Sequence, residues 1–222
     1  MSNAHEDSFA HVLSYLRNQF GIGIREDYLG SLYAYVMLAS QNNQTPTIVE
    51  LGCEKGLSTL VMASALHNCQ KKGRIYTIDP AFSGHVLIPD AHQQDGILYT
   101  HNHEEFIYHA KTLGVESYIQ KIAAYSWDVL ESWTKPIDLL FIDSEHTYSA
   151  MLKDCEWFKH ILLGGYIAID DWFNDIESSV RYYLSNHPGY TILHESTSAP
   201  HDGMIVTLLR KDFNNHDNHD KS

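Results

Sequence analysis

The chain has 222 residues, of which 44% are hydrophobic and 19% are charged, and its formal net charge at pH 7 is −13. These values are typical of a soluble globular protein whose length allows one large domain with a sizeable core. The net negative charge repels phosphate backbones, so we expect no nucleic acid as the main partner.

The three cysteines, Cys53, Cys69 and Cys155, favour a reducing compartment. An odd number without CxxC spacing indicates neither a disulfide framework nor a zinc site. The sequence has no apolar run of about 18 residues, and it starts with polar and acidic residues, so we expect neither a membrane span nor a signal peptide. These features predict a cytoplasmic protein without a membrane partner, and they leave a homo-oligomer open.

Residues 5–40 have the apolar spacing of helices, with an interruption around residues 21–23. A cluster of turn formers follows them. We therefore expect a helical N-terminal extension over residues 1–44 and a main domain over residues 45–211. The polar residues 212–222 are expected to form a disordered tail.

In the main domain, short β-rich runs alternate with longer helical patterns. Apolar strands separated by helices are typical of a parallel sheet with helices on both faces. The last two runs have no helix between them, so they should form an antiparallel hairpin at a sheet edge. The helix before the fifth run is expected to extend from Met151 to Leu162. The prediction is an α/β protein with a doubly wound, mostly parallel, seven-stranded sheet. The expected strands are Thr47–Leu51, Arg74–Ile78, Tyr118–Ala123, Ile137–Ile142, Tyr166–Ile169, Tyr190–Glu195 and Met204–Arg210.

The first expected strand leads into a turn that contains Gly52 and Gly56. Glycines let the backbone turn tightly and let a ligand approach the main chain. The turn matches neither the dinucleotide fingerprint nor a P-loop, and Glu50 and Glu54 would repel a pyrophosphate. Asp79 ends the second strand, where a carboxylate can accept both hydroxyls of a ribose. This set favours a nucleoside with a cationic, phosphate-free tail, such as S-adenosylmethionine; the alternative is a packing turn with Asp79 as a loop acid.

Residues 49–58, VELGCEKGLS, resemble motif I of the class I S-adenosylmethionine-dependent methyltransferases, and residues 75–80, IYTIDP, resemble their second motif. Residues 143–148, DSEHTY, and 164–171, GGYIAIDD, are similar to segments of the methyltransferase-24 type family. The resemblance covers roughly residues 45–210. It implies a Rossmann-like methyltransferase fold and methyl transfer from S-adenosylmethionine.

The resemblance also implies ligand roles by position. Glu50 and the glycine turn would line the methionine and sulfonium part, and Asp79 would bind the ribose. Ser126 would contact the adenine, although this chain has Ala-Tyr-Ser where the family often has Gly-Asx-Ser. The expected cofactor-binding residues are Glu50, Gly52, Gly56, Asp79, Ser126 and Asp143.

Asp143 follows the fourth expected strand, and Asp170 and Asp171 follow the fifth. These strands are neighbours in the expected topology, so the carboxylates should converge. Like charges at close range repel unless a cation joins them, and Mg²⁺ or another hard divalent ion prefers oxygen ligands. The arrangement resembles the metal site of catechol-type O-methyltransferases. The alternative is that these acids cap the helices that follow.

A metal ion beside a methyl donor suggests methyl transfer to oxygen, because the ion would lower the pKa of a substrate hydroxyl and orient its oxygen. His146 occupies the offset from Asp143 at which catechol-type relatives have a lysine base. We therefore expect His146 and Asp143 to be catalytic, and the substrate to be a small hydroxylated molecule. The alternatives are a surface histidine, a non-catalytic nucleoside-binding protein, or another reaction on this fold, such as hydroxylation.

Residues 82–103 are rich in turn formers and histidine, and they follow the expected ribose-binding acid. A long loop in this place would form a lid or a substrate wall. Trp172 and Phe173 follow the acid pair and are expected either to line a pocket or to pack in the core.

Overall fold

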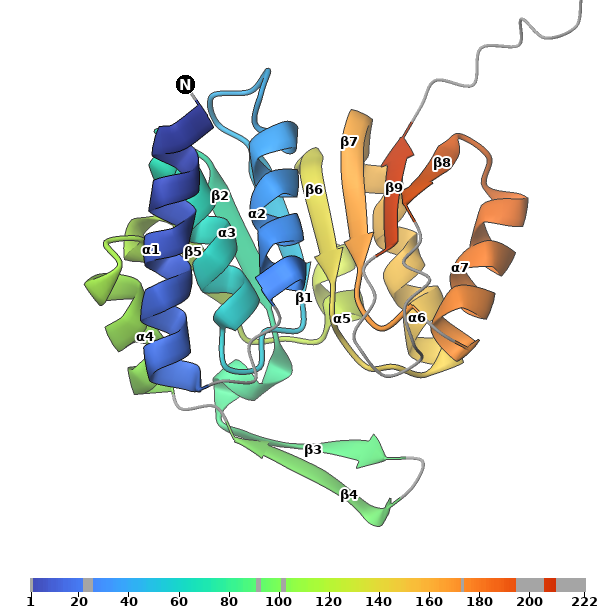
Figure 1. The fold of residues 1–222 in the computed structure, drawn as a ribbon. Coiled ribbons are helices and arrows are strands. Elements are labelled where there is room, and N and C mark those ends of the chain that lie inside the picture. The colour runs from blue at the N-terminus through green and yellow to red at the C-terminus, as the bar shows by residue number, and fades with distance from the viewer. Residues whose placement is uncertain are drawn as a thin grey trace, which may run out of the picture.

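The centre of the molecule is a seven-stranded sheet with the order β5 (Ile119–Ile122), β2 (Arg74–Ile78), β1 (Thr47–Leu51), β6 (Ile137–Ile142), β7 (Ile161–Ile169), β9 (Val206–Arg210), β8 (Tyr190–His194) (Figure 1). The first five strands in this order are parallel, and β9 is antiparallel to both β7 and β8. The predicted doubly wound α/β fold with an antiparallel C-terminal pair is therefore confirmed. The computed structural model describes residues 2–21, 26–90, 93–100, 103–172, 174–194 and 206–210.

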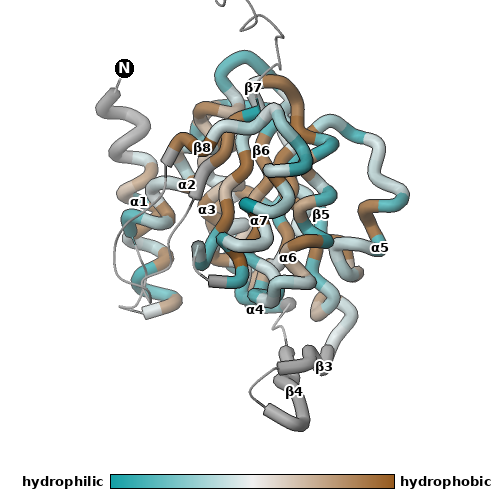
Figure 2. Tube along the Cα trace, turned by 90° about the vertical axis from the view of Figure 1, so that its right-hand side faces the viewer, coloured by the Kyte–Doolittle hydropathy of each residue, from teal (hydrophilic) through white to brown (hydrophobic). Residues whose placement is uncertain are grey.

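Helices cover both faces of the sheet and separate two apolar cores. Along β1 the side chains alternate, so Ile48 belongs to one core and Val49 to the other. The first core lies under α1 (Ser2–Phe20), α2 (Glu26–Ala39), α3 (Leu57–Asn68) and α4 (His103–Thr112). The second lies under α5 (Ser126–Leu130), α6 (Tyr148–Cys155) and α7 (Asn174–Asn186). Figure 2 shows the hydrophobic stretches concentrated in the central strands.

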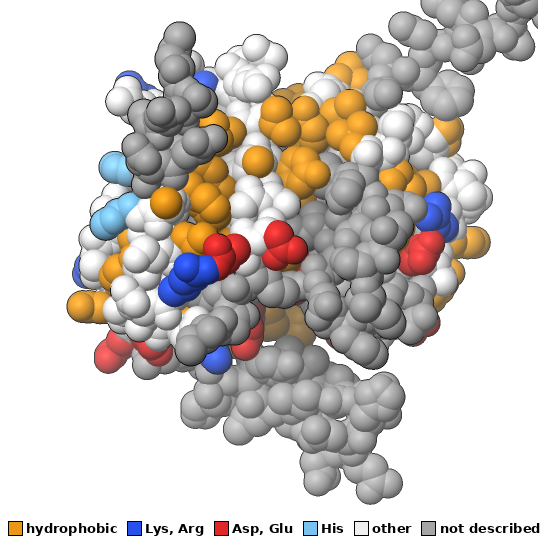
Figure 3. Space-filling model, viewed as in Figure 1, with side chains coloured by type: hydrophobic (Ala, Val, Ile, Leu, Met, Phe, Trp, Pro, Cys, Tyr) orange, Lys and Arg blue, Asp and Glu red, His pale blue; other side chains and the backbone are white. Residues whose placement is uncertain are grey.

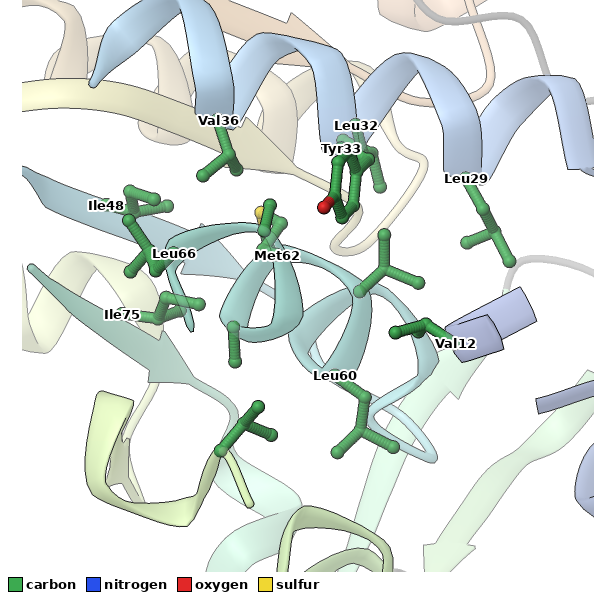
Figure 4. Packing of buried hydrophobic residues seen from close by; sticks show 14 of the residues in the cluster. Val12, Leu29, Leu32, Tyr33, Val36, Ile48, Leu60, Met62, Leu66 and Ile75 are labelled. Carbon is green, nitrogen blue, oxygen red and sulfur yellow. The ribbon is translucent and has the colours of Figure 1, made fainter. Parts of the chain in front are cut away.

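The N-terminal helices are part of the first core. Leu29, Leu32 and Val36 of α2 are fully buried and face α3, where Leu60 and Met62 are also fully buried (Figure 4). Burying one such side chain contributes roughly 1.5–3 kcal/mol. The expected division of the chain after residue 44 stays a prediction, as does the disordered tail, which lies outside the described residues.

The segment expected to be a loop contains a two-stranded hairpin. After the 3₁₀ turn η1 (Pro80–Ser83), β3 (His85–Asp90) pairs antiparallel with β4 (Gln93–Thr100), and the hairpin projects from the body (Figure 1). The expectation of a loop is therefore wrong for these two strands, whereas the expected role as a lid or a substrate wall stays a prediction. Pairing between the strands satisfies backbone hydrogen-bonding groups that an irregular loop leaves to water.

The helix expected to reach Leu162 is shorter. α6 ends at Cys155, a 3₁₀ segment η3 (Glu156–His160) follows, and β7 already begins at Ile161. The β6–β7 register shifts within this stretch, and Gly164 has a positive φ of 76°. Leu162 is consequently 39% exposed, because the irregular start of the strand turns it away from the core.

Trp172 is 3% exposed and belongs to the second core, which supports packing over the pocket-lining alternative. Phe173 lies outside the described residues. Among the helices that the structure describes, none is long and apolar enough to cross a membrane.

Candidate functional site

Two glycines of the turn after β1 are required by the packing of the protein itself. Gly52 and Gly56 have φ angles of 85° and 81°. A Cβ on Gly52 would lie 1.9 Å from the carbonyl oxygen of Asp143, and one on Gly56 would lie 2.2 Å from the ring of Phe106. The turn therefore brings the ends of β1 and β6 into direct contact, whatever ligand it also admits.

Asp79, at the end of β2, stabilises this turn through hydrogen bonds to its backbone. Its Oδ2 accepts hydrogen bonds from the backbone N–H of Cys53 at 2.9 Å and of Glu54 at 3.2 Å. Its Oδ1 accepts from the backbone N–H of Ala81 at 2.8 Å. Asp79 thus has a structural role in the turn, as in the alternative of a packing turn, and it lies at the edge where the ribose was expected.

Glu50, inside β1, is fully buried and points to the first turn of α3. Its Oε1 accepts a hydrogen bond of 2.6 Å from Ser58 Oγ, and its Oε2 accepts one from Thr59 Oγ1. Burial raises the pKa of Glu50 to about 7; the hydrogen bonds from Ser58 and Thr59 oppose this effect, and the charge of Asp143 adds to it. The carboxyl is therefore more readily protonated than that of an exposed glutamate, and a nearby cation would favour its charged form.

The acids at the ends of β6 and β7 lie at the same edge of the sheet. The N–H of Asp143 bonds to the carbonyl of Leu51, and the N–H of Asp170 bonds to the carbonyl of Ile142, both at 2.9 Å. Asp171 has a φ of 51°, which is rare for a residue with a side chain. Backbone conformations of this kind concentrate at functional sites.

His146 lies between the acids of the two strands. Its Nε2 is 3.7 Å from Asp143 Oδ1, and its Nδ1 is 3.1 Å from Asp171 Oδ2. The interaction with Asp143 raises the pKa of His146 most, burial lowers it, and the charges of Asp171, Asp143 and Asp170 raise it further, so the net shift is upward. The side chain stays 38% exposed, so an incoming ligand can reach it.

The residues of the expected metal site have suitable chemistry for a divalent ion, but their side chains are not arranged around one. Asp143, Asp170 and Asp171 offer the oxygen ligands that hard divalent ions prefer. Within the part of the chain that the structure describes, however, no group of three or more His, Cys, Asp or Glu side chains is arranged to hold a metal ion. Instead, His146 contacts two of the acids. The side chains would have to turn for an ion to bind.

The cap of α6 bears on the alternative reading of Asp143. The N-cap of this helix is Thr147, whose hydroxyl accepts a hydrogen bond of 3.3 Å from the N–H of Ala150. Asp143 therefore does not cap α6. Asp170 and Asp171 precede α7, which begins at Asn174. Phe173, directly before this helix, lies outside the described residues.

Asp154 of α6 is a buried carboxylate that the sequence reasoning missed. It is 1% exposed and accepts hydrogen bonds from the hydroxyls of Ser126 and Ser144. Ser126, the expected adenine contact, thus donates its hydroxyl proton to Asp154 within the protein. One signal was available: Asp154 lies three residues after Met151, on the apolar face of a helix.

Tyr28 of α2 was also missed. Its hydroxyl donates a hydrogen bond of 3.4 Å to Asp143 Oδ2, and its ring makes an edge contact with Phe141 at 6.2 Å between centroids. Nothing local in the sequence indicates this contact, because 115 residues separate the two partners. The N-terminal helices therefore reach the acidic site.

These side chains lie at the carboxyl edge of the strands, which is the lower edge in Figure 1. On the face seen in Figure 3, acidic side chains are found mainly in this lower half, and hydrophobic side chains gather above. The edge thus combines a tightly bonded turn with a neighbouring group of acids.

Comparison with known families supplies the identification. A family model described as "Methyltransferase domain", that of the methyltransferase-24 family, matches residues 49–172, more than half of the chain. The chain belongs to the methyltransferase-24 family. The expected assignment to the class I S-adenosylmethionine-dependent methyltransferases is therefore confirmed.

Solved structures with the same fold are more distant. The O-methyltransferase NovP has 16% identity and a TM-score of 0.65, with 85% of this chain and 81% of that chain covered. An O-methyltransferase from Bacillus cereus, in complex with SAH, has 16% identity and a TM-score of 0.60, with 92% and 91% covered. A putative rRNA-methylase from Clostridium thermocellum has 12% identity and a TM-score of 0.56, with 85% and 100% covered. At these identities the likeness concerns the fold alone.

One sequence relative is an uncharacterized protein, R132, of Acanthamoeba polyphaga mimivirus. It is 37% identical over 62 residues, which are 25% of this chain and 28% of that protein. The matched part is too short to transfer any property of the viral protein.

Proposed function

We propose that this methyltransferase transfers the methyl group of S-adenosylmethionine to a hydroxyl oxygen of a small molecule, with the help of a divalent ion such as Mg²⁺. The observation that carries the proposal is the contact between the turn after β1 and Asp143. It joins the edge expected to bind the methyl donor to the acids expected to bind the acceptor.

On the donor side, we assign the glycine turn and Glu50 to the methionine part, Asp79 to the ribose and Ser126 to the adenine. The raised pKa of Glu50 supports a cationic ligand, because a sulfonium nearby would relieve the cost of its burial. Asp79 lies at the end of β2, where a carboxylate can accept hydrogen bonds from the hydroxyls of a ribose.

On the acceptor side, we assign His146 as the general base. It removes the proton of the acceptor hydroxyl while the oxygen bonds to the methyl carbon and the carbon–sulfur bond breaks, which leaves a neutral thioether. In the structure both imidazole nitrogens lie beside a carboxylate, of Asp143 and of Asp171, which favours the protonated ring. His146 can act as the base only when one nitrogen is released, as it would be if these acids turned to bind an ion. Asp143, Asp170 and Asp171 would hold the divalent ion, which lowers the pKa of a bound hydroxyl when present.

The choice of a small acceptor over nucleic acid rests on charge. The formal net charge of −13 disfavours a phosphate backbone, although two of the structures with this fold are described as rRNA methylases. A cytoplasmic location agrees with Cys53, Cys69 and Cys155, which are free thiols.

The proposal can be tested in two steps. Titration calorimetry should detect binding of S-adenosylmethionine and no response to NAD. Incubation with a panel of phenols and sugars should then give products heavier by one methyl group, and a chelator should abolish turnover while donor binding persists. Tight NAD binding without donor binding would overturn the donor assignment. Full turnover in the presence of chelator would remove the metal ion.

A further inference from the structure

One buried carboxylate connects the two loops that border the proposed site. Asp154 Oδ1 accepts a hydrogen bond from Ser126, which follows β5, and its Oδ2 accepts one from Ser144, which follows Asp143. The two hydroxyls belong to segments that are 18 positions apart in the sequence. The side chain of Asp154 therefore fixes the position of Ser126, the expected adenine contact, relative to Ser144, which follows the expected metal ligand Asp143.

The surroundings of Asp154 provide little other compensation for its charge. Burial raises the pKa of Asp154 to about 6, although the hydrogen bonds from Ser126 and Ser144 oppose this shift. The charge of Glu145 also raises the pKa of Asp154, and the weaker opposing effect of Lys153, whose ammonium lies 4.3 Å from the centroid of the Trp127 ring, lowers it. Burying such a group costs free energy that an apolar residue would avoid, but an apolar residue would leave both hydroxyls without this acceptor.

The ionised carboxylate also fixes the direction of both hydrogen bonds. A carboxylate only accepts, so each serine must donate its single hydroxyl proton to Asp154. Toward any other partner, the Ser126 oxygen can then act only as an acceptor. A 6-amino group of adenine, which donates, is a suitable partner for such an oxygen, whereas the 6-oxo group of hypoxanthine, which accepts, is not. This discrimination requires that the Ser126 oxygen face position 6 of the purine, because N1 of hypoxanthine carries a proton and would donate to it instead.

We propose that Asp154 is a positioning residue that couples the two sides of the site: it orients Ser126 toward the purine of the methyl donor and Ser144 beside Asp143. The inference rests on the proposed function, since it takes Ser126 as the adenine contact. It adds a specificity to that contact, namely discrimination of a 6-amino purine from a 6-oxo purine.

The test compares the binding of S-adenosylhomocysteine with that of its deaminated form, S-inosylhomocysteine, by calorimetry. The wild-type protein should bind the adenine form ~10–100-fold more tightly, as expected for a hydrogen bond that the oxo group cannot make. Asp154→Asn keeps the shape but can donate to one serine, so it should reduce this ratio severalfold. A ratio that stays at the wild-type value in Asp154→Asn would overturn the proposal.

Asp138→Asn is a matched control for the loss of a buried carboxylate. Asp138 lies at the opposite end of the sheet, is 7% exposed, and accepts hydrogen bonds from Asn43 Nδ2 at 3.0 Å and from the N–H of Thr47 at 2.8 Å. This variant should lose stability and keep the wild-type purine ratio. An equal fall of the ratio in both variants would reduce Asp154 to a structural role.

Single serine variants keep the test valid if Asp154→Asn does not fold. Ser126→Ala should mainly weaken the binding of S-adenosylhomocysteine and so lower the ratio of its affinity to that of S-inosylhomocysteine. Ser144→Ala should mainly lower kcat. A Ser126→Ala variant with unchanged binding and ratio would overturn the inference. A wild-type protein that binds neither homocysteine derivative would instead overturn the proposed function, so the two failures are distinguishable.

Discussion

The two sides of the proposed site differ in how their acids are held. On the donor side, Glu50 and Asp79 are 0% and 7% exposed, and their carboxylates accept hydrogen bonds from the turn and helix beside them. On the acceptor side, the side chains of Asp143 and Asp171 are 33% and 27% exposed, and both contact His146. The donor side is therefore preorganised by the protein, whereas the acceptor side contains like charges whose balance depends on what binds there.

The largest expected effect on stability comes from a substitution at the contact between the turn after β1 and the end of β6. Gly52→Ala would place a Cβ 1.9 Å from a backbone oxygen of Asp143, and backbone at a strand end cannot move aside without disturbing both strands. We expect a loss of about 4 kcal/mol or more in the free energy of unfolding, measured by urea denaturation.

Gly164→Ala is the matched control for this change. Gly164 also has a positive φ, of 76°, but a Cβ there would meet nothing within 4 Å. The cost should therefore be only the ~1–2 kcal/mol of the left-handed conformation. Similar losses in the two variants would show that the contact between β1 and β6 is not tight.

Removal of the proposed base addresses the acceptor side alone. His146→Ala should lower kcat by ~10²–10⁴-fold, the usual contribution of general-base catalysis, and leave donor affinity nearly unchanged. The loss should be smaller for acidic phenols, which are already ionised. His187→Ala, at an exposed histidine after α7, is the control and should have wild-type kcat. Near-full kcat of His146→Ala on a weakly acidic hydroxyl would contradict the assignment.

Asp79→Ala should affect the donor side alone. It leaves the N–H groups of Cys53, Glu54 and Ala81 without their acceptor, so we expect a loss of ~1–3 kcal/mol in the free energy of unfolding. Donor affinity should weaken ~10–100-fold in calorimetry, with a smaller effect in Asp79→Asn, which keeps one acceptor oxygen. Wild-type affinity in both variants would limit Asp79 to its structural role.

The smallest expected effect is a proton released on donor binding. The pKa of Glu50 is raised to about 7 in the folded protein, from about 4.5 in the unfolded chain. Protonation of Glu50 therefore favours the folded state, and this contribution to the free energy of unfolding is complete below about pH 4.5 and is lost as the pH rises through 7. A bound cation favours the carboxylate and lowers this pKa, so binding at pH 7 should release up to about half a proton. Calorimetry in buffers of different ionisation enthalpy measures this release, and Glu50→Gln should abolish it. No release by the wild-type protein would place the cation away from Glu50.

The sequence was a good guide to the elements whose pattern is local. The five parallel strands are short apolar runs between helices, and their carboxyl ends are marked by acids such as Asp79 and Asp143. Parallel pairing brings these ends to one edge, so the placement of the acids along one edge of the sheet could be predicted without coordinates.

Features that depend on distant partners could not be predicted in this way. The β3–β4 hairpin is an exception, because its two strands are close in the sequence and it was missed since Pro89 and Gly96 favour a loop. The Tyr28 contact with Asp143 and the burial of Asp154 depend on how helices pack across the sheet. Local periodicity shows which face of a helix is apolar, but it does not show which polar group on that face will meet a partner.

The position of β9 has a consequence for how the chain can fold during synthesis. β9 is the last described strand in the sequence, yet it lies between β7 and β8. When β8 emerges from the ribosome, the strand that will join it to the sheet has not yet been made, and the edge of β7 is open. Unpaired strand edges favour aggregation. A chain interrupted before Val206 would therefore leave the β7 edge exposed, and this nascent state is where we expect the protein to depend most on chaperones.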